Sequence, residues 1–259
     1  MGIYPVEMNN LNESIQVIAI QGLPLVKSGD NLAELICEAC AVEDGDIICV
    51  ASTIVSKAKG YSRILKDVVP GERACRIADK TGEDPKFLQV VLDQACDVLI
   101  EAPFTLTQLK SGHVGVRSGV DASNVEDGLV IVLPEDPMEE AREICEQVKR
   151  RSGMTCGVII TDTCGRSFRR GQTGHAIGWS GMTAIRDFRG DTDLFGRRLE
   201  ITEEAVVDEI AGFANFIMGE SNRGVPAVLF RGIMPWTGHN SIYFSPDEDV
   251  IRRSLKKSD

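Results

Sequence analysis

The stretch that most constrains the fold is residues 157–181, which read Gly157-Val-Ile-Ile-Thr-Asp-Thr-Cys-Gly-Arg-Ser-Phe-Arg-Arg-Gly-Gln-Thr-Gly-His-Ala-Ile-Gly-Trp-Ser-Gly181. Residues 158–161 are apolar or β-branched, and such a run predicts a buried strand. The run is followed by Asp162 and Thr163, so we expect the strand to end there. A carboxylate and a hydroxyl at a strand end are hard oxygen ligands suited to Mg²⁺ or Mn²⁺. This strand end is therefore the first candidate for a site.

Positive charge and glycine gather just beyond that point. From Asp162 to Arg198 there are seven arginines and four aspartates, although the whole chain has a net charge of −11. The alternative is that Asp162 and Thr163 only form a turn or a helix cap. The density of arginines and glycines favours phosphate binding, since glycine lets backbone N–H groups approach a ligand. The residues concerned are Arg166, Arg169, Arg170, Gly165, Gly171, Gly174, Gly178 and Gly181.

The bulk composition restricts the class of protein. With 259 residues, 43% of them hydrophobic, the chain can bury a core as one large unit, which we expect to have two lobes. It shows no apolar run long enough to span a membrane and no secretory leader, so we expect a cytoplasmic protein. The acidic balance disfavours nucleic-acid binding, because phosphate backbones are bound through exposed Lys and Arg. A confined arginine cluster suits a small anionic substrate better.

Cysteine and histidine do not indicate a soft-metal site. Of the eight cysteines, Cys37 and Cys40 have C-x-x-C spacing, but no second pair completes a zinc pattern. We interpret the cysteines as small core residues. The three histidines are far apart in sequence, and His175 is expected to be structural. No P-loop or Gly-x-Gly-x-x-Gly motif occurs, so we expect neither a P-loop nor a Rossmann fold.

Hydrophobic periodicity predicts an α/β protein of the α+β kind, with mixed and antiparallel sheets, covering helices and a site between two lobes. Asp30 is expected to cap the first helix, and Asp136 to cap another through a capping box. Residues 97–133 switch to a period of two, which predicts an antiparallel ribbon. The expected strands are 14–20, 47–51, 98–101, 104–109, 113–117, 128–133, 158–161, 182–188 and 227–231; the expected helices follow residue 30, fall within 71–95, follow 136 and span 202–218.

Two further places carry chemistry-bearing side chains. The strand 47–51 is followed by Ser52, Thr53 and Lys57, where Lys57 is either a phosphate ligand or a solvated surface lysine. A glycine-spaced loop contains Asp121 and Asn124, which suit a metal ligand and a nucleotide contact, or else an Asx turn. Both alternatives stay open at this point.

Six motifs, in order along the chain, match a known family. They are Gly22-Leu-Pro-Leu25, Ala51-Ser-Thr-Ile-Val-Ser-Lys57, Gly119-Val-Asp-Ala-Ser-Asn124, Ile160-Thr-Asp-Thr-Cys-Gly-Arg166, Asp193-Leu-Phe-Gly-Arg197 and Gly224-Val-Pro226. With them the chain resembles, over roughly residues 16–235, the coenzyme F420:L-glutamate ligases (coenzyme F420-0 gamma-glutamyl ligases). The resemblance implies a homodimer with a fold of its own. It also implies an enzyme that uses GTP to attach L-glutamate to the deazaflavin precursor and then extends a γ-glutamyl tail.

The resemblance also implies roles for individual residues. Asp162 and Arg166 would be catalytic. Asp121 and Asp162 would hold one divalent ion, Mg²⁺ or Mn²⁺, and Thr163 a second, with K⁺ as a further ion. The remaining metal ligand, usually glutamine in the family, falls on Glu220, which adds a negative charge beside the phosphates. The implied GTP contacts are Gly22, Leu23, Pro24, Leu25, Ser52, Thr53, Lys57, Asn124, Met218, Gly219, Glu220, Ser221, Asn222, Arg223, Gly224 and Val225.

The chemistry of amide formation agrees with these roles. Phosphorylation by GTP turns a carboxylate oxygen into a leaving group, and such transfer needs positioning and charge neutralisation rather than a protein nucleophile. Two other functions fit the same residues. One is a glutamate ligase of the same mechanism acting on a folate or pterin acceptor, and the other is a non-catalytic sensor of metal and nucleotide. These residues specify neither the number of glutamates added nor a preference for GTP over ATP.

Overall fold

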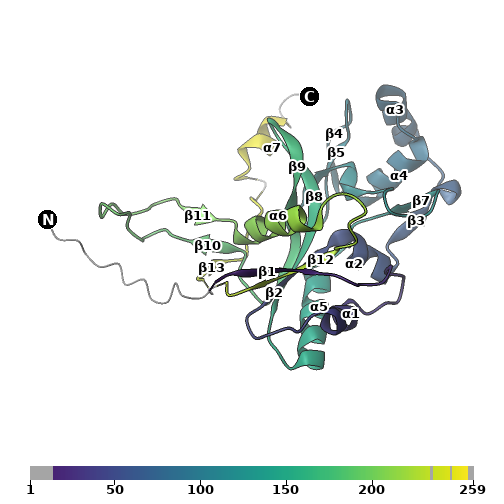
Figure 1. Ribbon diagram of the computed structural model, residues 1–259. Helices are drawn as coiled ribbons and strands as arrows, with labels where there is room; N and C mark the ends of the chain where they lie inside the picture. Colours follow the sequence, from purple (N-terminus) through teal and green to yellow (C-terminus); the bar gives the residue numbers. More distant parts are fainter. Residues whose placement is uncertain (1–13, 234–235, 246, 256–259) are drawn as a thin grey trace.

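The computed structural model describes residues 14–233, 236–245 and 247–255, and a five-stranded sheet lies at its centre (Figure 1). β2 and β8 pair in parallel, whereas the other neighbours pair antiparallel. In spatial order the strands are β1 (Gln16–Ile20), β12 (Ala227–Arg231), β2 (Ile47–Ala51), β8 (Gly157–Arg166) and β9 (Arg169–Ser180). The mixed α/β class predicted from the sequence is confirmed.

Helices cover both faces of this sheet. Ile48 and Val50 of β2 face one core and Ile47 and Cys49 face the other, as the period-two geometry of a strand requires. The first core is shared with α1 (Leu32–Ala39), α2 (Ser52–Lys59) and α5 (Pro137–Ser152). The second is shared with α6 (Val206–Met218). A strand buried on both faces explains the continuous apolar runs in the sequence.

Helix caps agree with the sequence at one position and differ at another. At α5 the Asp136 side chain accepts a hydrogen bond from the backbone N–H of Glu139 at 3.1 Å, so the predicted cap is confirmed. The prediction that Asp30 caps the first helix is wrong, because Asn31 is the N-cap of α1. Asp30 instead accepts a hydrogen bond from the backbone N–H of Lys27 at 2.7 Å, which closes the turn before the helix.

The strand predicted to end at Asp162 does not end there. β8 continues to Arg166 and returns as β9, so the glycines of this stretch lie within a β-hairpin rather than in an open loop. The pairing of β8 with β9 shifts its register after Ile160. At this shift the backbone N–H of Ala176 donates a hydrogen bond to Asp208 Oδ1 of α6 at 2.8 Å. The polar residues and glycines after Asp162 suggested a loop. Hydrogen bonding between β8 and β9 along the hairpin instead stabilises this segment as strand.

Smaller sheets and helices surround the central sheet. The predicted antiparallel ribbon forms from three strands, but its expected fourth strand, β7, pairs with β3 instead. The remaining elements are β3 (Ser62–Ile64), β4 (Asp97–Ile100), β5 (Leu106–Gln108), β6 (Val114–Val116), β7 (Leu129–Ile131), β10 (Ile185–Asp187), β11 (Glu203–Glu204), β13 (Gly238–His239), α3 (Glu72–Thr81), α4 (Pro85–Gln94), α7 (Val250–Leu255) and the 3-10 turns Leu65–Asp67 and Arg117–Gly119.

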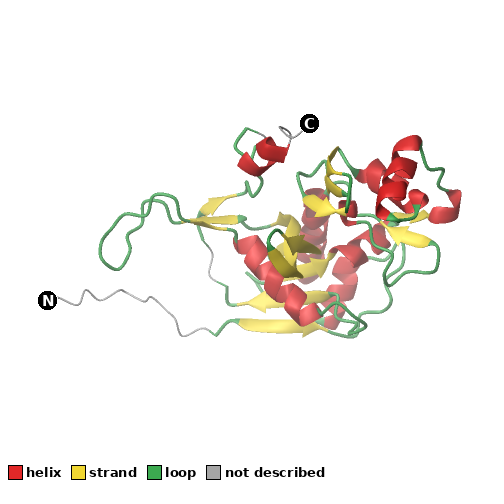
Figure 2. Cartoon of the chain, turned by 90° about the horizontal axis from the view of Figure 1, so that it is seen from above, coloured by secondary structure: helices red, strands yellow, loops and turns green. Residues whose placement is uncertain are grey.

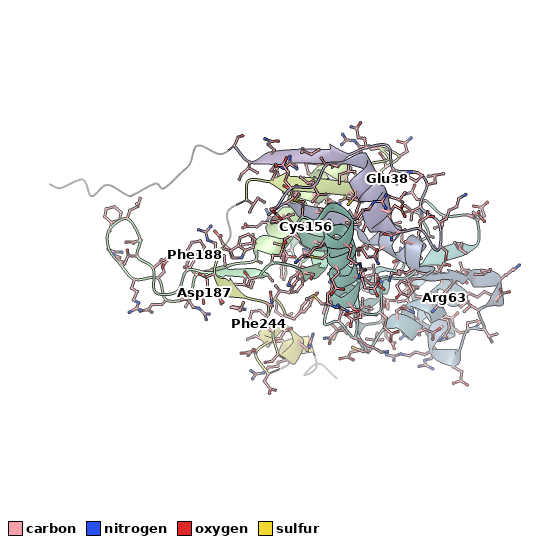
Figure 3. The ribbon with its side chains drawn as sticks, turned by 90° about the horizontal axis from the view of Figure 1, so that it is seen from below. Glu38, Arg63, Cys156, Asp187, Phe188 and Phe244 are labelled. Carbon is pink, nitrogen blue, oxygen red and sulfur yellow. The ribbon has the colours of Figure 1, made fainter. Side chains whose placement is uncertain are left out.

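A long arm, residues 188–202, projects from the molecule on the side opposite α3 and α4 (Figure 2). Asp187 and Phe188 mark its base (Figure 3). Its apolar residues Leu194, Phe195 and Ile201 are about nine-tenths exposed, at 92%, 91% and 88%. In the part of the chain that the structure describes, none of the helices is both long and apolar enough to cross a membrane.

Candidate functional site

Three loops and a helix start meet at one end of the central sheet. Ile20 at the end of β1 pairs with Ala227 at the start of β12, and the backbone N–H of Ala51 donates to Pro226 O at 2.9 Å. Ala51 also pairs with Thr161 of β8. The loops 21–25 and 219–226 therefore lie beside the start of α2 and beside Asp162 and Thr163. The structure brings together most of the segments that the resemblance assigns to nucleotide and metal binding.

The start of α2 offers backbone donors to a ligand. β2 passes directly into α2, and Ala51 at the N-cap position supplies no side-chain acceptor. The first N–H groups of a helix lack intrahelical partners, and the helix dipole favours an anion there. Ser52, in the first turn, is buried and donates its hydroxyl to Asp162 Oδ1 at 2.8 Å. The start of α2 is thus tied to the carboxylate of the neighbouring strand.

Lys57 reaches across to the loop between β6 and β7. Its Nζ donates to the backbone carbonyl of Asn124 at 2.7 Å, and the side chain is half-buried. Asn124 has a left-handed backbone, with φ of 52°, a conformation that asparagine tolerates better than most residues. The contact favours Lys57 as a residue of the site over Lys57 as a solvated surface lysine.

Asp162 lies in a crowded, partly desolvated position. Burial raises the pKa of Asp162 to about 6, the Ser52 hydroxyl and the Thr163 backbone oppose the rise, and the carboxylates of Asp121 and Glu220 add to it. A Cβ at Gly119 would come within 2.4 Å of Leu133 Cδ1 and 3.4 Å of Asp162 Oδ2, so glycine is needed for this close approach. Negative charge accumulates here without an ion pair to Lys or Arg among the described residues.

Glu220 and Thr163 meet on the opposite face of β8. Thr163 Oγ1 donates to Glu220 Oε1 at 2.9 Å, and the amide of Asn215 on α6 donates to both, at 2.7 Å to Glu220 Oε1 and 3.0 Å to Thr163 Oγ1. α6 approaches the hairpin closely because Gly174 has no side chain: a Cβ there would lie 2.4 Å from Ala211 O. Glu220, where the resemblance leads one to expect a glutamine, is thus held by neutral donors.

Asp121 forms the Asx turn that was one of its two interpretations. Its Oδ1 accepts from the backbone N–H of Ser123 at 2.8 Å and its Oδ2 from the Ser123 hydroxyl at 2.5 Å. It also lies close enough to Asp162 to raise the pKa of that group. Within the described ranges, no three His, Cys, Asp or Glu side chains already surround a metal-sized point. The oxygen donors of Asp121, Asp162 and Glu220, with their uncompensated charge, are nevertheless the set that a hard divalent ion prefers.

The arginines of the hairpin lie away from this centre. Arg166 is four residues beyond Asp162 on the same strand, about 13 Å at the usual rise of a strand. Its Nη2 donates to Arg170 O at 3.1 Å, which braces the hairpin tip. Arg169 and Arg170 are exposed there. Met218, assigned by resemblance to GTP binding, has its side chain in the core under α6, so only its backbone faces the loop.

Asn215 is the residue of the site that sequence reasoning missed. It bridges Thr163 and Glu220, yet it belongs to none of the six motifs. The available signal was its position as the lone amide in the run Phe213-Ala-Asn-Phe-Ile-Met218. A polar residue inside an apolar helical stretch is usually buried with a hydrogen-bonding purpose.

Comparison with known proteins gives a consistent result. A family model described as F420-0:Gamma-glutamyl ligase matches residues 21–232. The chain is 48% identical to the coenzyme F420:L-glutamate ligase of Archaeoglobus fulgidus, over 94% of this chain and 98% of that protein. It is 44% identical to the proteins of the same name from Methanosarcina mazei, over 93% and 96%, and from Haloarcula marismortui, over 94% and 98%.

Proposed function

Because the chain belongs to the F420-0:gamma-glutamyl ligase family, we propose that it uses GTP to join L-glutamate to coenzyme F420-0 and then adds γ-linked glutamate. The observation that supports this most is the convergence at one sheet end. Asp162 there is joined to Ser52 at the uncapped start of α2, with Asp121, Glu220 and Lys57 around it. An anion-binding helix start beside clustered carboxylates suits nucleotide phosphates held with a cation.

The proposed reaction has two steps. An acceptor carboxylate oxygen attacks the γ-phosphorus of GTP, the bond from that phosphorus to the bridging oxygen breaks, and GDP leaves. The neutral α-amine of L-glutamate then attacks the acyl carbon, the bond to phosphate breaks, and the nitrogen loses a proton to solvent. Each amide formed thus consumes a GTP and releases GDP and phosphate. Neither step needs a nucleophile from the protein, only positioning and charge neutralisation.

The described residues fit a divalent cation as oxygen donors. Asp121 and Asp162 would hold one ion, Thr163 and Glu220 a second, and Mg²⁺ or Mn²⁺ is the class that these donors select, with K⁺ as a further ion. Bound there, the ions would supply charge neutralisation to the phosphates. The protein's own contribution is to position the carboxylates: Ser52 orients Asp162, and Asn215 orients Glu220.

The nucleotide would lie across the three loops. The N–H groups at the start of α2 and the Lys57 ammonium are the phosphate-binding groups, as a helix start and a point charge usually are. The loops 21–25 and 219–225 flank them and are largely exposed, so they remain accessible to the rest of the nucleotide. Asn124 is held at the same place through its carbonyl.

We also propose a homodimer in which the arm contacts a second copy of the chain. Leu194 and Phe195 are almost fully exposed at the end of the arm, where the Asp193 carboxylate rigidifies the turn by accepting from the backbone N–H groups of Phe195 and Arg197 at 2.9 and 2.8 Å. A rigid, apolar tip is typical of an interface rather than of a solvated loop. Light scattering of the Phe195→Asp variant should show monomer where the unmodified chain shows dimer; an unchanged mass would exclude this contact.

The proposed function is tested by incubating the protein with GTP, Mn²⁺, L-glutamate and coenzyme F420-0 and measuring products by mass spectrometry. The expected result is a product heavier by a glutamyl residue, formed with stoichiometric GDP and phosphate. Parallel reactions with ATP and with a folate acceptor test nucleotide and acceptor choice. Binding of GTP and metal without turnover of any acceptor would instead indicate a sensor.

A further inference from the structure

A cavity lies beside the site, and the nucleotide and metal binding proposed above does not use it. Its volume is about 270 Å³. It is open on one side and is lined by the β8–β9 hairpin, by the turn that precedes β6, and by residues 242–244, Asp249 and Arg252, the last of which belongs to α7. Phe244, which also lines the cavity, lies next to α7 (Figure 3). These C-terminal residues lie beyond residues 21–232, the part matched by the family model.

The cavity and Asp162 share one face of the hairpin. Alternate residues of a strand face the same side, so Cys164, which lines the cavity, points to the side of Asp162. His175, which also lines it, is the direct cross-strand partner of Asp162. Directly paired side chains lie about 5 Å apart at their Cβ atoms. A small molecule in the cavity is therefore within reach of a reaction at Asp162.

The cavity wall carries buried polar groups that lack partners. Arg252 is only 8% exposed; its Nε makes no hydrogen bond within the described residues and lies 3.7 Å from Asp249 Oδ2. The buried hydroxyl of Tyr243 likewise makes no hydrogen bond there. Unsatisfied buried donors are costly, and in a cavity wall such donors are available to hydrogen-bond a ligand.

The charge of the wall favours an acid group. Arg252 is cationic, and Tyr243 and a neutral imidazole can each donate a hydrogen bond. His113 is 6% exposed, and burial, together with His175, lowers its pKa to about 4, so it is uncharged near neutral pH. Arginine binds carboxylates with geometry that lysine does not reproduce.

We propose that this cavity binds the amino-acid substrate, with Arg252 and the Tyr243 hydroxyl holding a carboxylate of L-glutamate so that its amine faces the Asp162 side of the hairpin. This assignment rests on the proposed ligase function. The size of the cavity supports the smaller substrate, because pockets for drug-sized ligands usually measure about 300–1,000 Å³. A deazaflavin with its phosphodiester tail is much larger than a free amino acid. The nucleotide segments lie elsewhere, around the start of α2.

The test compares steady-state constants for each substrate in the complete reaction. Arg252→Gln should raise the KM for L-glutamate about tenfold or more while leaving the KM for GTP within about twofold. Arg252→Lys should give a KM for L-glutamate between those of the unmodified protein and Arg252→Gln, because lysine keeps the positive charge but lacks the planar guanidinium. Tyr243→Phe should raise the same KM by about threefold, as loss of a neutral hydrogen bond does. Arg253→Gln, at the exposed neighbouring position, is the matched control and should change neither constant.

Each outcome bears on the proposal. A rise confined to the KM for coenzyme F420-0 would assign the cavity to the acceptor, and one confined to the KM for GTP would assign it to the nucleotide; either overturns the inference. Unchanged constants in both Arg252→Gln and Tyr243→Phe also overturn it, provided circular dichroism shows folded variants. If Arg252→Gln does not fold, Tyr243→Phe decides alone. Absence of ligation by the unmodified chain would refute the proposed function instead, which keeps the two failures distinct.

Discussion

The two ends of the central sheet treat buried carboxylates in opposite ways. At one end Asp46, which is 1% exposed and immediately precedes β2, pairs with Arg231 through two hydrogen bonds, Nε to Oδ1 at 2.9 Å and Nη2 to Oδ2 at 2.8 Å. At the other end Asp162 has only neutral donors, and two further carboxylates increase its pKa. One end carries its own counter-charge, and the other lacks one among the described residues.

This difference separates a structural acid from a functional one. A buried carboxylate needs compensation, and a guanidinium within the same fold supplies it permanently. At Asp162 the fold provides no nearby cation and places two more carboxylates close by. A bound cation from outside the chain is therefore expected to neutralise these charges. The same residue type is thus expected to serve stability at one end of the sheet and ligand binding at the other.

The largest expected effect is from Asp162→Asn. Removing one of the site's three carboxylates should reduce kcat by about 100- to 1,000-fold, since an electrostatic group at a reacting phosphate is lost. The melting temperature should equal or exceed that of the unmodified protein, because like charges no longer crowd together. Asp127→Asn, an exposed aspartate of the neighbouring loop, is the control. Activity within a few-fold of the unmodified protein would remove Asp162 from the catalytic site.

The converse pattern is expected for Asp46→Asn. The change should lower the free energy of unfolding by about 1–3 kcal/mol, because it removes the charge of the buried acceptor that binds Arg231, which keeps its ion pair to Glu43 at 2.7 Å. kcat and both KM values should stay the same at temperatures where the variant is folded. Urea unfolding and steady-state kinetics on the same preparation measure both quantities. If Asp46→Asn lowered kcat but left the free energy of unfolding unchanged, the proposed difference between Asp46 and Asp162 would be wrong.

Lys57→Ala should have a smaller effect, limited to the nucleotide. Loss of a point charge at the phosphates should raise the KM for GTP about tenfold with little change in kcat. Lys66→Ala, at an exposed lysine in the 3-10 turn after β3, is the matched control. Equal GTP affinity in the two variants would return Lys57 to the class of surface lysines.

The smallest effect is expected from Glu220→Gln. The amide carbonyl can still accept the hydrogen bonds from Thr163 and Asn215, so the loop should keep its position. A hard cation binds a neutral oxygen less tightly than a carboxylate, so the metal concentration for half activity should rise about threefold at unchanged kcat. Metal titration at saturating GTP provides the measurement, and superimposable curves for the two forms would take Glu220 out of the metal site.

Sequence reasoning performed best where the signal is local. The apolar run 47–51, the cap at Asp136 and the mixed α/β class all follow from short-range pattern, and the structure confirms them. It failed at the hairpin, where residues 163–166 have the composition of a loop but belong to β8 and pair with β9. Only the pairing partner, which the local pattern does not reveal, makes that segment a strand.

The site shows the same division between local and long-range information. The order of the six motifs pointed to segments that the fold then places side by side, but nothing in that order locates Asn215 on α6. The cavity is harder still to foresee, because His113, His175 and Arg252 come from three distant parts of the chain. Single arginines and histidines at such spacing look like ordinary surface or core residues.

Residues 242–245 and 247–252 make one wall of the small cavity from a part of the chain that lies beyond residues 21–232, whereas Asp121, Asp162 and Glu220 lie within that range. The cavity wall and the three carboxylates can therefore be altered independently of one another by mutagenesis. A chimera that takes only this wall from a relative would separate the contribution of the wall to substrate preference from the contribution of the carboxylates to the reaction.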